Sequence, residues 1–231
     1  MNKLGDPVIC YVTDWNGLRG NRDIAALRAC ILGAISAGVN WVQIREKDLR
    51  ARDSCELVKA VTEEARRASS GRTLRTRILV NDRLDVALAA GADGVHLGGT
   101  SLPIAAINEW RHVGVLPAGF QLGVSCHSFA EVEAAERDGA DYIFFGPVFA
   151  TPSKEEFGAP QGIERLAQAS SSVKIPVIAI GGIRVENARL CVQAGAAGIA
   201  AIRMFQETTD LHGTVGMLRE RMKASAADIG N

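Results

Sequence analysis

The chain has 231 residues, of which 47% are hydrophobic and 23% are charged, and its 26 basic side chains balance its 26 acidic ones. This balance gives no overall field that would recruit nucleic acid or an anionic membrane surface. We therefore expect small-molecule substrates as partners, with no nucleic acid and no membrane. The length fits one large domain that spans residues 1–231.

The cysteines are odd in number, widely scattered and without a Cys-x-x-Cys pair; they are Cys10, Cys30, Cys55, Cys126 and Cys191. This usage argues against a disulfide framework and against a zinc site, so we expect reduced core residues. No apolar stretch of about 18 residues occurs, and the first strand is reached without a long apolar segment. These features predict a soluble, cytoplasmic protein. The oligomeric state stays open, with a homo-oligomer among the alternatives.

Apolar runs of strand length recur eight times along the chain. They are Val8 to Thr13, Trp41 to Ile44, Arg77 to Val80, Gly94 to Leu97, Gln121 to Val124, Asp141 to Phe145, Pro176 to Ile180 and Gly198 to Ile202. Segments with helical periodicity alternate with them. These are Asp23 to Ser36, Ala51 to Ala68, Leu84 to Ala90, Pro103 to Arg111, Phe129 to Arg137, Ile163 to Ala169, Val185 to Gln193 and Gly213 to Ala224.

Runs that are apolar on nearly every residue are typical of parallel strands whose two faces are both covered. Eight strand and helix units without a linker predict an α/β fold, a single-domain (β/α)8 TIM barrel. The alternative is an open doubly wound sheet that binds a dinucleotide. That fold would need a G-x-G-x-x-G turn after an early strand, and the sequence has none.

In a barrel, ligands bind at the C-terminal ends of the strands, so the polar residues that end each apolar run are the candidates. The second run ends in Gln43-Ile-Arg-Glu-Lys47. The alternation of a strand directs Gln43, Arg45 and Lys47 to one side, which favours an anion site. The alternative is a structural role in which the two cations pair with acidic neighbours.

The third run ends in Asn81 and Asp82, whose oxygens are the hard ligands that magnesium prefers. Alternatively this pair caps the helix that follows. After the fifth run, Ser128 and Glu131 have the spacing of a capping box. His127 lies just before them, and it is either a structural residue or a proton carrier at the active face.

The sixth run leads into the loop Gly146-Pro-Val-Phe-Ala-Thr-Pro-Ser-Lys154, which holds two hydroxyls and a lysine. The seventh run leads into Gly181 and Gly182, whose bare backbone can approach a ligand closely. Together with the amides after Ile202, these groups form the usual phosphate position of a barrel. Lys154 is either a solvated surface residue or part of a loop, residues 149–161, that closes over substrate.

Six segments together resemble the thiamine phosphate synthase family, within the thiamine-phosphate pyrophosphorylase and thiazole tautomerase superfamily. They are Gln43-Ile-Arg-Glu-Lys47, Val80-Asn-Asp82, Gly94-Val-His-Leu-Gly98, Gly123-Val-Ser-Cys-His127, Gly146-Pro-Val-Phe-Ala-Thr-Pro-Ser-Lys154 and Ile180-Gly-Gly-Ile183. The resemblance implies a barrel transferase that needs Mg²⁺. It would join a hydroxymethylpyrimidine diphosphate to a thiazole phosphate, giving thiamine phosphate and releasing diphosphate.

The resemblance also implies residue roles. The pyrimidine diphosphate would be held by Gln43, Arg45, Lys47, Asn81, Ser125 and Lys154. The thiazole phosphate would be surrounded by Thr151, Ser153, Gly182, Ile202 and Arg203. Arg45, Lys47 and Lys154 would stabilise the leaving diphosphate, with Mg²⁺ on Asp82, and His127 is a candidate catalytic residue.

Two positions depart from the family pattern. Ser101 stands where the family has an aspartate that binds magnesium, which predicts weaker magnesium binding. Arg203 stands where a small residue is more usual, and it would add a phosphate contact. The departures leave two alternatives: a thiazole tautomerase, which uses a histidine at the position of His127, or a non-catalytic thiazole phosphate carrier or regulator. We favour the synthase because a tautomerase has no diphosphate for Arg45 and Lys47 to bind.

Overall fold

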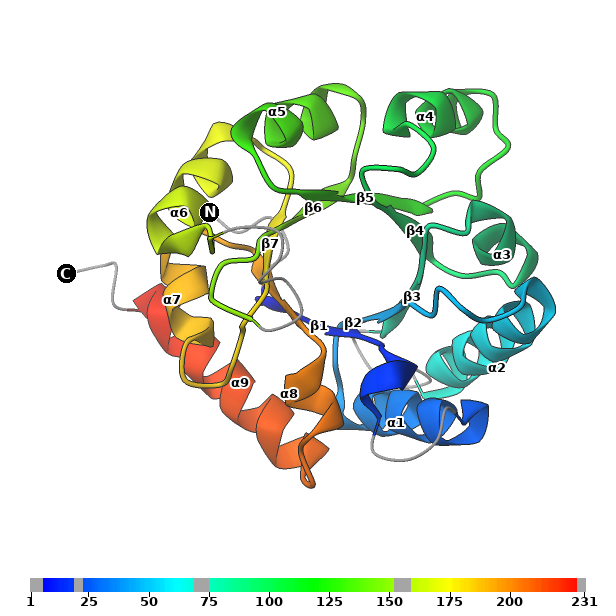
Figure 1. The fold of residues 1–231 in the computed structure, drawn as a ribbon, viewed down its shortest axis with the longest axis horizontal. Helices are drawn as coiled ribbons and strands as arrows, with labels where there is room; N and C mark the ends of the chain where they lie inside the picture. Colours follow the sequence, from blue (N-terminus) through cyan, green and yellow to red (C-terminus); the bar gives the residue numbers. More distant parts are fainter. Residues whose placement is uncertain (1–5, 19–22, 69–74, 152–158, 228–231) are drawn as a thin grey trace.

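The computed structural model describes residues 6–18, 23–68, 75–151 and 159–227. The described chain forms a closed barrel of parallel strands that follow one another in sequence order around the ring (Figure 1). The strands are β1 (Val8–Val12), β2 (Trp41–Ile44), β3 (Arg77–Asn81), β4 (Gly94–Leu97), β5 (Gln121–Cys126), β6 (Tyr142–Phe145), β7 (Val177–Ile180) and β8 (Gly198–Ala201). The predicted (β/α)8 barrel is confirmed.

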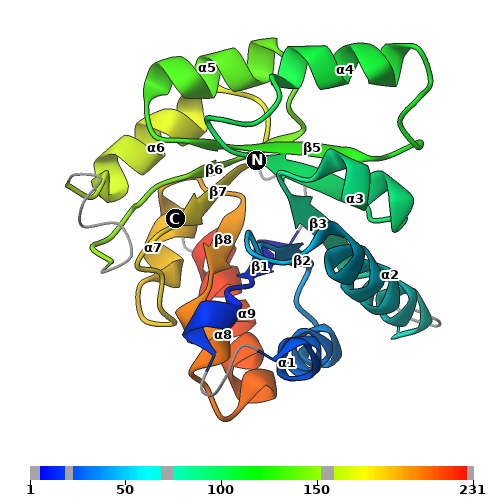
Figure 2. The same cartoon turned by 45° about the vertical axis from the view of Figure 1, so that its right-hand side comes forward.

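Helices cover the outside of the barrel, as the turned view in Figure 2 shows. The α-helices are α1 (Ile24–Ala37), α2 (Ala51–Ala68), α3 (Leu84–Ala89), α4 (Ile104–His112), α5 (Phe129–Arg137), α6 (Gly162–Ser172), α7 (Ala188–Gln193), α8 (Arg203–Gln206) and α9 (Leu211–Ala227). The capping box predicted at the start of α5 is present, with Ser128 and Glu131 each bonded to the other's backbone. No described helix combines the length and apolarity needed to cross a membrane.

Two short elements were not predicted: the 3-10 helix η1 (Trp15–Gly17) after β1, and α8 after β8. Both are shorter than the window over which helical periodicity can be recognised. Helix α7 also begins later than predicted, at Ala188. The Asn187 side chain accepts a hydrogen bond from the Arg184 amide (2.8 Å), which holds a turn before the helix begins.

The barrel has two apolar cores, one between the sheet and the helices and one inside the ring of strands. The inner core contains the large side chains of Trp41, Leu79, Tyr142 and Phe144. Room for them comes from small residues on neighbouring strands. A Cβ on Gly123 would lie 2.0 Å from Cζ of Tyr142, so only glycine fits there. The interior is therefore a packed core, and a ligand site must lie at its mouth.

The cysteines predicted to be reduced core residues are all free. Cys10, Cys126 and Cys191 are buried, whereas Cys30 and Cys55 are half-buried. Burial raises the pKa of the Cys126 thiol to about 12, so this group stays protonated near neutral pH. The buried cysteines therefore fill space in the core.

Candidate functional site

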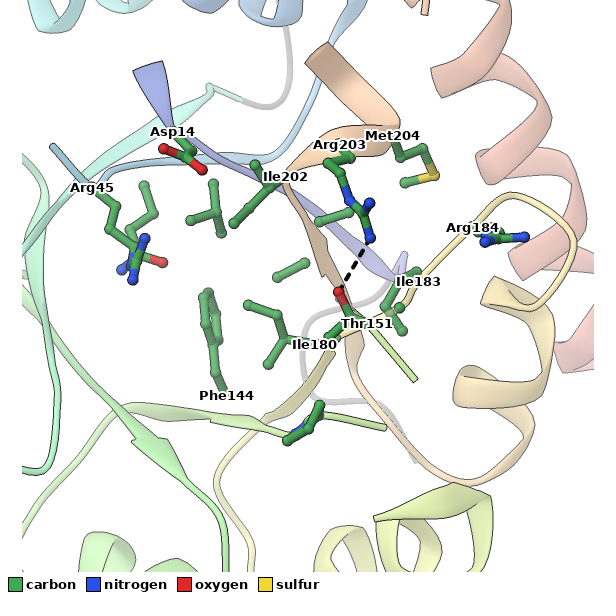
Figure 3. A pocket seen from close by; sticks show the side chains of 18 of the residues that line it. Asp14, Arg45, Phe144, Thr151, Ile180, Ile183, Arg184, Ile202, Arg203 and Met204 are labelled. Carbon is green, nitrogen blue, oxygen red and sulfur yellow. Dashed lines mark hydrogen bonds between the residues drawn. The ribbon is translucent and has the colours of Figure 1, made fainter. Parts of the chain in front are cut away.

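A cavity of about 550 Å³ opens at the C-terminal ends of the strands (Figure 3). Its wall draws on residues at the ends of β1, β2, β3, β5, β6, β7 and β8. Ten residues singled out from the sequence line it: Gln43, Arg45, Asn81, Ser125, His127, Thr151, Gly181, Gly182, Ile202 and Arg203. Parallel strands in one ring all end at the same mouth, so residues far apart in sequence converge there.

One end of the cavity is formed by polar side chains from β2 and β3. Gln43, only 2% exposed, donates from Nε2 to Oδ1 of Asn81 (2.8 Å), which fixes the orientation of both amides. Arg45 extends from the end of β2 into the same region. In the described part of the chain no carboxylate lies within 4.0 Å of the Arg45 guanidinium, so the structure does not show the ion-paired alternative for this residue.

The neighbouring Glu46 points to the other side of the strand, as the alternation predicted. It accepts a hydrogen bond from Oγ1 of Thr13 (2.5 Å) and another from the amide of Trp15 (3.0 Å). Thr13 in turn accepts from the Arg45 amide (2.9 Å). Burial raises the pKa of Glu46, although the bonds from Thr13 and Trp15 oppose the shift. This network ties η1 to β2 and holds the backbone from which Arg45 projects.

Ser125, from β5, places a hydroxyl at the cavity wall, and a buried histidine forms a hydrogen bond with this hydroxyl. Its Oγ lies 3.0 Å from Nε2 of His96, a β4 residue that is 1% exposed. Burial lowers the pKa of His96 to about 3, and the positive charge of Arg45 adds to this shift. The sequence placed His96 in a motif but assigned it no role.

His127 lies at the end of β5, against the loop that follows β6. Its Nδ1 is 2.5 Å from the carbonyl oxygen of Gly146. A carbonyl only accepts, so Nδ1 carries the proton and donates, which leaves Nε2 as the other ring nitrogen at the cavity. The Gln161 side chain also donates to the His127 carbonyl (2.9 Å). His127 is thus held in one orientation.

The opposite end of the cavity is formed where the loop after β6 packs on the end of β7. The amides of Val148 and Phe149 donate to the carbonyls of Ile180 (2.9 Å) and Gly181 (3.0 Å). Gly182 follows with a φ of 64°, and a Cβ there would lie 2.6 Å from the Ala150 carbonyl oxygen. Only glycine therefore allows this close approach, which brings the next loop residue to the cavity wall.

That residue is Thr151, which is 9% exposed. Nη2 of Arg203, at the start of α8, donates to its Oγ1 (3.3 Å; Figure 3). The hydroxyl and the guanidinium thus meet at the end of the cavity formed by β6, β7 and β8. Between the two polar ends lie the apolar side chains of Phe144 and Ile180.

Residues 15–205 match the family model described as thiamine monophosphate synthase. The chain belongs to this family. It is 39% identical over 210 residues to the thiamine-phosphate synthase of Moorella thermoacetica, covering 91% of this chain and 93% of the relative. It is also 39% identical over 202 residues to the thiamine-phosphate synthase of Chlorobium luteolum, with 87% and 86% covered.

A solved structure shows the same likeness in three dimensions. The thiamine phosphate pyrophosphorylase from Pyrococcus furiosus superposes with a TM-score of 0.78 at 31% identity, covering 94% of this chain and 96% of that one. The family resemblance inferred from the six segments is therefore confirmed.

Three residues to which the thiamine monophosphate synthase resemblance gave roles lie outside the cavity wall. Lys47 and Asp82 are exposed, and Ser101 is half-buried in the loop after β4. Ser101 Oγ accepts from the amide of Gly98 (2.7 Å), so its hydroxyl oxygen already supports a turn of that loop. Two further predicted residues, Ser153 and Lys154, lie outside the described residues, together with most of the loop 149–161.

Asp82 is the acidic residue expected to bind magnesium in this family, and its backbone is unusual. It has a φ of 68°, which residues other than Gly, Asn and Asp rarely adopt. Helix α3 has Arg83 as its N-cap and no side-chain cap hydrogen bond. The alternative prediction, in which Asn81 and Asp82 cap this helix, is therefore wrong. Asp82 remains exposed near the mouth of the barrel.

This donor set fits magnesium only together with substrate. Among the described residues no three His, Cys, Asp or Glu side chains gather closely enough to hold a metal ion alone. Magnesium commonly binds through one or two carboxylates plus substrate phosphates and keeps several waters. The lone carboxylate of Asp82 suits that mode of binding.

Several cavity residues were missed from the sequence: Asp14, Phe144, Arg184, Glu186, Met204 and Glu207. Asp14 directly follows the first predicted run, Val8 to Thr13, so the rule that strand ends form the site would have found it. Its Oδ1 instead accepts from the Asn16 amide (3.2 Å) and caps η1. Met204 and Glu207 are on or next to α8, which the sequence did not predict.

Proposed function

We propose that this protein is a thiamine-phosphate synthase that couples hydroxymethylpyrimidine diphosphate to a thiazole phosphate, giving thiamine phosphate and diphosphate. One observation carries the proposal beyond family membership: a single cavity has two polar ends with an apolar middle. Arg45 lies at one end and Arg203 at the other, so each end suits an anion. The apolar middle, with Phe144 and Ile180, suits two aromatic rings between the anions.

The diphosphate end would promote departure of the leaving group. Breaking the bond between the pyrimidine methylene carbon and the diphosphate oxygen builds negative charge on the diphosphate. Arg45, Asn81 and Ser125 would donate to its oxygens, and preorganised donors of this kind are worth most at a site sheltered from water. Lys47 and Lys154 are proposed for the same anion on the family resemblance alone.

Magnesium is proposed as the cofactor, held by Asp82 and by the oxygens of the bound diphosphate, with a minor contribution from the Ser101 hydroxyl. It would neutralise part of the charge of the leaving group. Since Asp82 is the one carboxylate proposed here as a ligand among the described residues, we expect magnesium and the diphosphate substrate to bind together.

The thiazole end would position the nucleophile. Thr151, Arg203 and the backbone at Gly182 would hold the phosphate, with Ile202 packing beside it and Ser153 proposed from the family pattern. The thiazole nitrogen then forms a bond to the methylene carbon as the diphosphate leaves with the bonding pair. Because the substrate itself is the nucleophile, orientation of the two rings matters more than an activated side chain.

Thiazole tautomerase activity is the second candidate, and the geometry of His127 favours it. With Nδ1 committed to the Gly146 carbonyl, Nε2 is the ring nitrogen left to exchange a proton with a substrate in the cavity. Such a reaction would need neither the diphosphate nor magnesium.

The deciding assay supplies both substrates and Mg²⁺ and measures thiamine phosphate and diphosphate. We expect equimolar products. No coupled product, together with isomerisation of a carboxythiazole phosphate, would replace the synthase with the tautomerase. His127→Ala refines the result: a modest loss of coupling fits the synthase, whereas near-complete loss of isomerisation with coupling intact assigns His127 to the second activity.

A further inference from the structure

His96 lies beneath the cavity floor, where it contacts a cavity residue without lining the cavity itself. It projects from β4 into the barrel, is 1% exposed, and packs at a tilt of 38° against Phe144, with ring centroids 4.1 Å apart. Both ring nitrogens have partners on the next strands. Nδ1 lies 3.1 Å from the Tyr142 hydroxyl and Nε2 lies 3.0 Å from Ser125 Oγ.

A neutral imidazole has one N–H donor and one nitrogen acceptor, so its two partners cannot play the same role. The ring of His96 is neutral because it is enclosed by barrel strands and aromatic side chains, and because the Arg45 cation opposes a second positive charge. One of Tyr142 and Ser125 must therefore donate to the ring and the other must accept from it.

The Tyr142 hydroxyl determines which partner donates to His96. Tyr142 is 1% exposed inside the barrel, and in the described part of the chain its hydroxyl has a hydrogen bond only to His96. A buried phenol proton needs an acceptor, so Tyr142 donates to Nδ1. Nε2 then carries the ring proton and donates to Ser125. In the reverse arrangement the phenol proton would be buried without a partner.

This assignment determines the role of the Ser125 hydroxyl at the cavity wall. Since Ser125 Oγ accepts from His96, the Ser125 proton is free to point into the cavity as a donor. We propose that His96 and Tyr142 are positioning residues that fix the Ser125 hydroxyl as a hydrogen-bond donor toward an anionic substrate oxygen. Under the proposed function, on which this last step rests, that oxygen belongs to the pyrimidine diphosphate.

The protonated nitrogen can be observed directly. In protein labelled with ¹⁵N-histidine, His96 is one of four histidines and is assigned by comparison with His96→Gln. At neutral pH we expect a proton on Nε2 and none on Nδ1. A proton on Nδ1 would overturn the proposal. This readout needs no activity, so it holds even if the protein does not make thiamine phosphate.

Tyr142→Phe removes the phenol proton with the smallest change in packing. We expect the single tautomer to be lost and the Kd of inorganic diphosphate with Mg²⁺ to rise about tenfold, the scale of one hydrogen bond to a charged group. In a Ser125→Ala background the same change should have no further effect on that Kd. An equal rise in both backgrounds would show a general packing effect and overturn the proposal.

Tyr11→Phe is the matched control. Tyr11 is as buried as Tyr142, at 1% exposed, but it packs on Phe205 on the outer side of β1, with ring centroids 5.5 Å apart. We expect it to leave both the His96 tautomer and the diphosphate Kd unchanged. If it changed them as Tyr142→Phe does, the effect would belong to any lost buried hydroxyl and the assignment would fail.

Discussion

Nη2 of Arg203 donates a hydrogen bond to Oγ1 of Thr151 across 3.3 Å, although the two residues are 52 positions apart in the sequence. The bond joins the loop after β6 to the start of α8, and so links both neighbours of β7 at the cavity. Among the described residues, the hydrogen-bond partner of this positive charge is therefore a hydroxyl.

We expect Arg203→Ser to weaken thiazole phosphate binding by about 3- to 10-fold, because the guanidinium is exposed and its charge is partly screened by water. Binding should also become less dependent on salt concentration. The measurement is calorimetric titration of thiazole phosphate at two ionic strengths.

Thr151→Val tests whether the two residues act together. If Thr151 holds the guanidinium toward the phosphate, the loss in the double variant should be smaller than the sum of the single losses. Strictly additive losses would show that the bond has no role in binding. The Kd of inorganic diphosphate with Mg²⁺ should stay unchanged in all three variants.

Arg45→Gln should lower kcat for coupling by about 100-fold or more, the scale seen when one preorganised donor to a developing anion is removed. The KM for thiazole phosphate should change little, since Arg45 lies at the other end of the cavity. Arg50→Gln is the control, because Arg50 is exposed and pairs with Asp53 (2.7 Å) away from the cavity wall. Equal effects of both substitutions would argue against a specific role for Arg45.

Asp82→Asn should weaken apparent magnesium affinity in the coupling reaction by about tenfold or more, because it removes the one carboxylate proposed as a ligand. Asparagine tolerates the φ of 68° at this position, so stability should be retained. The control is Asp85→Asn, three residues further on, which removes an exposed carboxylate paired with Arg83 (2.6 Å).

Ser101→Asp makes the opposite change at the position where the family has an acidic ligand. We expect it to raise apparent magnesium affinity, measured as the Mg²⁺ concentration that gives half-maximal coupling. A magnesium titration identical to that of the unmodified protein would count against a metal site between the loops after β3 and β4.

Gly182→Ala should destabilise the fold by about 2–4 kcal/mol, because the added Cβ combines a positive φ with a clash against the Ala150 carbonyl. Gly119→Ala is the matched control: its φ is 76°, but nothing lies within 4 Å of the added Cβ. It should cost only about 1–2 kcal/mol. Urea unfolding measures the loss of stability in both variants. Equal losses would show that the close approach to Ala150 is not the reason for glycine at position 182.

The sequence predicted the barrel because the strands are largely buried on both faces, and continuous apolar runs such as Trp41 to Ile44 mark such strands clearly. Strand boundaries differ by at most two residues from those observed. The short helix α8 could not be predicted, since four residues carry no periodicity. Its position depends on Ile202 and Phe205, which pack only once β8 is in the barrel.

The candidate site was predictable where a residue lies within one position of a strand's C-terminal end, as for Arg45, Asn81 and Ser125. The sequence does not show the direction of each side chain or the buried residues that contact it. Lys47 follows the alternation of β2, yet it lies beyond the strand's end and outside the cavity wall. The role of His96 depends on Tyr142, 46 residues away, and only the folded barrel brings them together.

The most direct test of the account is whether one cavity holds two anions at opposite ends. The Kd of inorganic diphosphate with Mg²⁺ is measured by calorimetry with and without saturating thiazole phosphate. We predict that both bind at once, with the diphosphate Kd unchanged or lowered, weakened by Arg45→Gln and unaffected by Arg203→Ser. Mutual exclusion of the two ligands, or equal sensitivity to the two substitutions, would contradict a cavity with two separate anion sites.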